Sequence, residues 1–210
     1  MSSRIYTVSL KGSEVKVTDD QLSEFAAMYI VSDEIRNRIS ELLWLDLYIF
    51  DLKFGVGPDD VLREIKNLES GEADPQTKPA SQFSRKPLKG LWHKHFFSAH
   101  FVPHNISNAL KGGVLEKLVN KVLDPSKSPI ITKEMISELS HRVVHEPIED
   151  RANDNKLTGE WIVFAKHNQK NYYLCCNTHN AGDQMIFDRI ESHCPRDFPF
   201  VSALLASANA

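Results

Sequence analysis

Two β-rich runs near the end of the chain, at residues 160–166 and 171–177, constrain its fold more than any other feature. Both runs are dense in β-branched, aromatic and other apolar residues, and only the four residues 167–170 separate them. A short polar connection between two such runs is typical of an antiparallel hairpin. The sequence therefore predicts an antiparallel sheet in the C-terminal half.

The N-terminal half is predicted to be mainly helical behind a short hairpin. Residues 5–10 and 14–17 alternate apolar and polar around Lys-Gly-Ser. Thr18 and Gln21 have the spacing of a capping box, in which each side chain bonds the other residue's backbone N–H. A second helix is expected from residue 32 or 33, with apolar residues on one stripe up to residue 47. A third is expected from Pro58 to about Gly71.

The rest of the chain alternates between irregular and regular stretches. Three prolines and a single aromatic residue make 71–87 a predicted flexible loop. The other expected elements are an extended segment at 91–102, helices at about 105–122 and 132–145, a closing helix at 183–193 stopped by Pro195, and a frayed tail at 204–210. We therefore expect one α+β domain, with helices in front and a small antiparallel sheet and closing helix behind.

Composition limits the classes of partner. The chain is 41% hydrophobic and 25% charged, which suits a globular protein with a core. Its net charge of −3 does not attract polyanions, so contact with RNA requires a local basic patch. A stretch without acidic residues, from Lys78 to Lys94, could supply one, although a solvated linker is the more common explanation for such a run. Its basic residues are Lys78, Arg85, Lys86, Lys89 and Lys94.

The three cysteines, Cys175, Cys176 and Cys194, indicate a structural role in a reducing compartment. Their number is odd, and Cys-Cys lacks the two-residue spacer of a zinc knuckle. Buried small hydrophobes are the better interpretation. The chain begins without an apolar stretch of signal-peptide length, and no segment has the roughly twenty apolar residues of a membrane span. We therefore expect a cytoplasmic protein that makes no membrane contact.

Histidines concentrate in the middle of the chain. Four of the nine fall between residues 93 and 104, and two more are His141 and His145. His93 and His95 are two apart, so a strand would direct both to one face, and residues four apart share one face of a helix. The spacing therefore predicts that imidazoles converge.

The leading hypothesis is a metal-independent hydrolase that cleaves phosphodiesters, with RNA as the substrate, in the manner of a toxin or defence effector. One imidazole would remove a proton from a ribose 2′-hydroxyl, a protonated one would donate a proton to the leaving oxygen, and a lysine would stabilise the phosphate. No cofactor is needed for this chemistry. The candidate catalytic residues are His93, Lys94, His95, His100 and Lys166.

Two other hypotheses remain open. In the first, His93, His95, His141 and His145 hold a divalent transition metal such as zinc in a metal-dependent hydrolase, although no known protease motif is present. In the second, the chain is not an enzyme, and its histidines are structural. It would then bind a regulatory protein partner through exposed apolar residues between 31 and 54.

The chain loosely resembles the small bacterial ribonuclease toxins of the barnase and RelE kind, because it combines a helical front, a basic extended segment and a terminal hairpin followed by a helix. The resemblance covers only the back half of the chain. No motif carries it, so no residue role is transferred from that family. The acidic net charge also departs from the basic character of those toxins.

Overall fold

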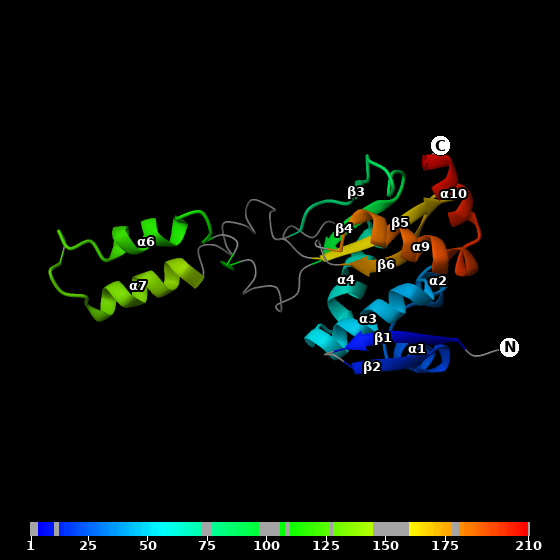
Figure 1. Ribbon diagram of the computed structural model, residues 1–210, viewed down its shortest axis with the longest axis horizontal. Helices are drawn as coiled ribbons and strands as arrows, with labels where there is room; N and C mark the ends of the chain where they lie inside the picture. The colour runs from blue at the N-terminus through cyan, green and yellow to red at the C-terminus, as the bar shows by residue number, and fades with distance from the viewer. Residues whose placement is uncertain are drawn as a thin grey trace. The chain divides into compact units, whose positions relative to one another are not determined.

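The computed structural model of this chain divides into two compact units. Unit 1 comprises residues 1–74, 79–96 and 160–210, and unit 2 comprises 75–78 and 97–159. The structure describes residues 4–10, 13–72, 77–96, 106–107, 110–126, 128–144, 160–177 and 181–209. The sequence pattern had predicted one domain, whereas the contacts divide the chain into these two units. The predicted mixed α+β class is confirmed (Figure 1).

Unit 1 begins with the predicted hairpin. Strands β1 (Ile5–Leu10) and β2 (Ser13–Thr18) pair antiparallel and form a two-stranded sheet. Thr18 then caps helix α1 (Asp19–Ala27) in the predicted capping box with Gln21, because each side chain accepts a hydrogen bond from the other residue's backbone N–H. The local sequence is therefore sufficient to specify this part of the fold.

The single helix expected from residue 32 is divided in two. Ser32 caps the short α2 (Asp33–Arg36), and Ser40 caps α3 (Glu41–Phe54). Between the two helices, Ile39 forms a parallel β-bridge with Tyr173. The Tyr173 N–H donates to the backbone oxygen of Arg38 at 2.8 Å, and the Ser40 N–H donates to the backbone oxygen of Tyr173 at 2.9 Å. Pairing with a strand thus replaces the helical hydrogen bonds at this point.

Helix α3 lies in the hydrophobic core. Leu42, Leu43 and Leu47 are each at most 1% exposed, and Leu45 and Phe50 are also buried. Leu52 is 48% exposed, but most of the other described apolar side chains between residues 31 and 54 are buried. Little apolar surface is therefore available there for the predicted docking of a partner, which stays a prediction. Helix α4 (Pro58–Ser70) follows, with Pro58 in its first turn and Gly71 as its left-handed C-cap, as predicted.

The second sheet of unit 1 has four antiparallel strands, which follow one another in chain order. They are β3 (Ser81–Gln82), β4 (Trp92–Phe96), β5 (Glu160–His167) and β6 (Lys170–Asn177). The predicted hairpin of β5 and β6 is confirmed, and Asn168 and Gln169 form its turn with positive φ. Helix α4 packs against β4, and α3 and α9 (Asp183–Asp197) pack against β6.

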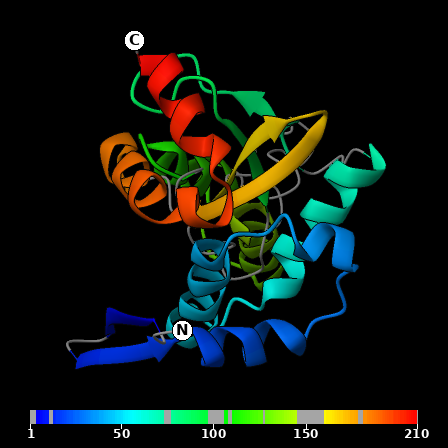
Figure 2. The ribbon, with the colours of Figure 1, turned by 90° about the vertical axis from the view of Figure 1, so that its right-hand side faces the viewer.

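The C-terminal helices differ from the sequence prediction. Helix α9 continues through Pro195 to Asp197, because a proline in the last turn removes only one intrahelical hydrogen bond. Residues 204–209, predicted to fray, belong to helix α10 (Phe200–Asn209), in which Val201 and Leu205 are buried. Figure 2 shows α9 and α10 beside the β5–β6 hairpin.

Unit 2 contains a helical hairpin. Helices α6 (Val114–Val122) and α7 (Lys133–Val144) pack side by side, and Gly113 begins α6 in the left-handed conformation (Figure 1). Among the described residues of unit 2, Val122 is the only buried hydrophobic side chain. No helix in the described parts of either unit has the length and apolar character to cross a membrane.

The three cysteines are free thiols inside unit 1, and all are buried. Burial raises the pKa of Cys175 and Cys176 well above the usual range and that of Cys194 to about 12. Because the thiolate is the reactive form, the native protein should be inert to thiol reagents. We expect no fast reaction with Ellman's reagent in buffer and three thiols per chain in denaturant. Stoichiometric labelling of the folded protein would contradict this assignment.

Candidate functional site

Two of the predicted site residues meet on one face of β4. The ring centroids of His93 and His95 are 5.7 Å apart, with the ring planes at 74°. His93 is half-buried, whereas His95 is only 5% exposed. Strand alternation alone puts both rings on this face, so the sequence spacing already indicated their proximity.

Aromatic side chains from the adjacent strands surround the two imidazoles. Phe83 lies 4.5 Å from His93 and Trp161 lies 5.1 Å from it, centroid to centroid. The Oγ atom of Ser81 on β3 lies 3.2 Å from Nε2 of His93, its register partner on β4. We call Ser81, Phe83, His93, His95 and Trp161 the imidazole site. Ser81 could not be predicted from the sequence pattern, because only the pairing of β3 with β4 brings it next to His93.

Lys94 points to the opposite face of β4. Its Nζ atom lies 3.4 Å from Oε2 of Glu64 on α4, and the two side chains are only 6% and 1% exposed. The structure therefore separates Lys94 from the imidazoles by the thickness of the sheet and places it in a buried ion pair.

Lys166 also lies apart from the imidazoles. Its Nζ atom is 3.8 Å from the ring centroid of Trp92, which shares the Lys94 face of β4 by strand alternation. A phosphate held at His93 and His95 would therefore need another cation.

The other predicted site residues belong to unit 2 or lie outside the described residues. His141 lies on α7 in unit 2, and His100 and His145 fall outside the described residues. Within the described ranges, no cluster of three or more His, Cys, Asp or Glu side chains is placed to hold a metal ion. The metal-site hypothesis therefore gains no support from the described residues.

A cross-strand row extends from the imidazole site to an arginine. His95, Trp161 and Asn177 are register partners on adjacent strands, so their side chains share a face. Nη1 of Arg189 on α9 donates to Oδ1 of Asn177 at 2.9 Å, and its Nη2 pairs with Asp46. Burial opposes the charge of Arg189, but the Asp46 carboxylate outweighs it and raises the arginine pKa. Arg189 was also missed, because the sequence pattern of α9 identified only its apolar residues.

Exposed basic residues lie close to this row in the chain. The loop between β3 and β4 carries Arg85, Lys86 and Lys89, and all three are exposed. The predicted basic stretch is therefore divided, because Lys94 is buried while these three face solvent. They give the edge of the sheet next to β3 a local positive charge, although the chain as a whole is acidic.

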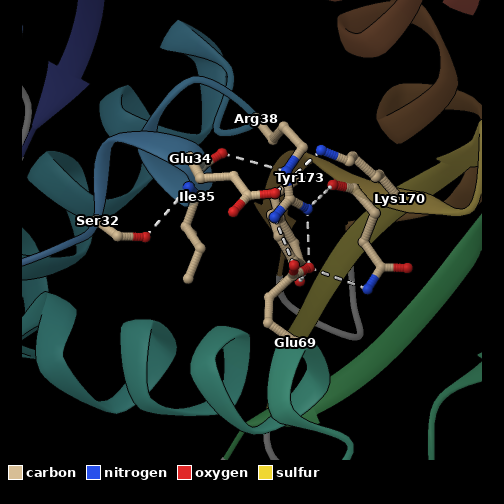
Figure 3. Close-up of polar contacts among 8 residues, drawn as sticks. Ser32, Glu34, Ile35, Arg38, Glu69, Lys170 and Tyr173 are labelled. Carbon is tan, nitrogen blue, oxygen red and sulfur yellow. Dashed lines mark hydrogen bonds and ion pairs between the residues drawn. The ribbon is translucent and has the colours of Figure 1, made fainter.

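A second polar cluster links α4 to β6 (Figure 3). Arg38 donates to both carboxylate oxygens of Glu69, at 2.9 and 2.5 Å, and the hydroxyl of Tyr173 donates to Oε1 of Glu69 at 2.6 Å. Arg38 also donates to the backbone oxygen of Asn171 at 2.7 Å. Because these contacts satisfy the buried groups among themselves, we assign the cluster a structural role.

Unit 1 also has a hollow of about 400 Å³ between α1, α3 and α9. Glu41 and Asp197 line it, but their carboxylates already accept hydrogen bonds. Tyr6 donates to Glu41 at 2.6 Å, Arg4 pairs with Glu41 at 3.0 Å, and the Glu41 N–H donates to Asp197 at 2.9 Å. This hollow therefore offers weaker chemistry than the imidazole site.

Comparison with known proteins does not identify the chain. No protein-family model, curated protein or solved structure matches it.

Proposed function

We propose that this chain is a metal-independent hydrolase of RNA phosphodiesters and that His93 and His95 carry the proton transfers. The observation that carries the proposal is the 5.7 Å separation of the two rings on one sheet face. Two adjacent imidazoles can act as a general base and a general acid at neutral pH.

The proposed reaction balances without a cofactor. One imidazole removes the proton from a ribose 2′-hydroxyl, and the 2′ oxygen attacks phosphorus. The bond from phosphorus to the 5′ oxygen breaks, and the other imidazole, in its protonated form, donates a proton to that oxygen. The products are a 2′,3′-cyclic phosphate and a 5′-hydroxyl end.

Charge and stacking around the imidazoles support RNA as the substrate class. Trp161 and Phe83 are half-buried beside His93, so their rings resemble the stacking platforms that bind unpaired bases. Arg189 stands at the far end of the same row, two strands from His95, and is already paired with Asp46, so it is not assigned a contact with the phosphate. The exposed cations of the β3–β4 loop would offset the acidic net charge locally.

The test is cleavage of a single-stranded RNA in EDTA. We expect 2′,3′-cyclic phosphate ends, no cleavage of DNA of the same sequence, and a loss of at least about a hundredfold in kcat/KM for His93→Ala. His167→Ala is the matched control, because His167 stacks on Phe200 with centroids 4.0 Å apart. Growth arrest on expression that His93→Ala relieves would support the role of toxin or defence effector.

Two results would count against this proposal. Cleavage that EDTA abolishes and zinc restores would favour the metal-dependent hydrolase instead. RNA that stays intact with the wild-type protein at every pH between about 5 and 8, the range in which histidine normally titrates, would end the proposal.

A further inference from the structure

The α6–α7 hairpin of unit 2 exposes an unusual amount of apolar surface. Six of its large hydrophobic side chains are 41–70% exposed, namely Val114, Leu115, Ile130, Ile131, Ile136 and Val144. Burying such side chains is the main source of helix stability in a protein, and two helices alone cannot enclose a core. The hairpin thus has the surface of half a helical bundle.

The exposed residues follow the helical repeat. In α6, Val114, Leu118 and Val122 recur every four residues, but only Val122 is buried, and Leu115 lies on the adjoining exposed flank. In α7, Ile136, Ser140 and Val144 also recur every four residues, and all three are exposed. The apolar face of each helix is therefore wider than its contact with the other.

We propose that a second copy of this chain covers this face and that the two hairpins form a four-helix bundle. The pattern on α7 is self-complementary. If two copies of α7 pack antiparallel about a two-fold axis at Ser140, Ile136 of each copy meets Val144 of the other, and the small serines allow the helices to approach closely.

The two ends of the hairpin match under the same symmetry. Val114, Leu115 and Val144 lie at one end of the antiparallel pair, and Ile130, Ile131 and Ile136 lie at the other. A two-fold axis across the helices places the first group of each copy against the second group of the other. Both apolar ends are then covered in a closed dimer.

Area and charge are consistent with this partner. Six such side chains, 41–70% exposed, present several hundred Å² of apolar surface. Together with the surrounding polar residues, this surface can reach the ~800 Å² that each partner buries in a standard interface. The two helices carry four basic and three acidic side chains, so one copy does not repel another electrostatically. This inference is independent of the proposed RNA cleavage.

The first test measures the mass of the full-length chain by light scattering after size-exclusion chromatography. We expect twice the 23.9 kDa of one chain and a return to the monomer mass for Leu115→Arg. Asn120→Arg introduces the same side chain on the polar face of α6 and should leave the dimer intact. Circular dichroism of both variants checks that the helices remain folded.

The second test locates the symmetry axis. Ser140→Cys should give a disulfide-linked dimer under mild oxidation, whereas Asn120→Cys should not, and the three native cysteines are buried and do not interfere. A 23.9 kDa species at the highest concentration reached would overturn the proposal. Cross-linking of Asn120→Cys without that of Ser140→Cys would also overturn it, because it would place the interface on the polar face.

Discussion

Glu69→Gln is expected to lower the free energy of unfolding of unit 1 by about 3–5 kcal/mol, because it leaves a buried arginine without its counter-charge. The side chain of Arg38 is 7% exposed and that of Glu69 is 20% exposed, so solvent screens the pair only weakly. The glutamine oxygen can still accept the Tyr173 hydrogen bond, which is 2.6 Å long in the wild type. The loss therefore comes mainly from the missing charge.

The measurement is urea unfolding followed by tryptophan fluorescence. All three tryptophans, Trp44, Trp92 and Trp161, belong to unit 1, so the signal reports that unit alone. Arg63→Gln is the control, because it breaks the exposed pair of Arg63 with Asp60 and should leave the midpoint nearly unchanged. An equal midpoint for Glu69→Gln and the wild type would show that the Arg38 cluster does not stabilise the fold.

The same variant should change the response of unit 1 to acid. Burial raises the pKa of Glu69, but the hydrogen bonds from Arg38, Tyr173 and Asn171 outweigh it and place the pKa below its usual range. The stabilisation is therefore present above the unfolded-state pKa of about 4.3 and is lost as the pH falls through the lower folded-state value. We expect a flatter loss of stability below about pH 4 in Glu69→Gln than in the wild type.

Local patterns in the sequence predicted the elements whose hydrogen bonds are local. The capping box of Thr18 and Gln21 and the hairpin of β5 and β6 are both correct, because each is decided within a few residues. The break between α2 and α3 was missed, because it depends on Ile39 pairing with Tyr173, more than a hundred residues away in the chain. Apolar periodicity contains no information about such a contact.

The candidate site, like the fold, was predictable only where the arrangement is decided within one strand. Strand alternation correctly brings His93 and His95 together, and the same rule sends Lys94 to the other face, which the grouping of all three residues overlooked. Ser81 and Arg189 reach the row only through strand register and helix packing. Sequence spacing can therefore indicate which residues of one strand share a face, but not which distant residues join them.

Breaking the ion pair of Lys94 and Glu64 is expected to cause the other large loss of stability. Lys94→Met should destabilise unit 1 by about 3–5 kcal/mol, because Glu64 is 1% exposed and would lose the charge opposite it. Replacing both members by apolar residues, in Glu64→Leu with Lys94→Met, should recover most of that loss, since the desolvation penalty of both charges disappears. Urea unfolding followed by tryptophan fluorescence compares the three proteins.

The double variant also separates a structural lysine from a catalytic one. If Lys94 serves only the core, the double variant should fold like the wild type and keep its RNA cleavage, while His93→Ala remains inactive. If the refolded double variant were as inactive as His93→Ala, Lys94 would have to act on the substrate despite its place on the opposite face of β4. A stability loss in the double variant equal to that of Lys94→Met would instead show that the pair is not the source of the effect.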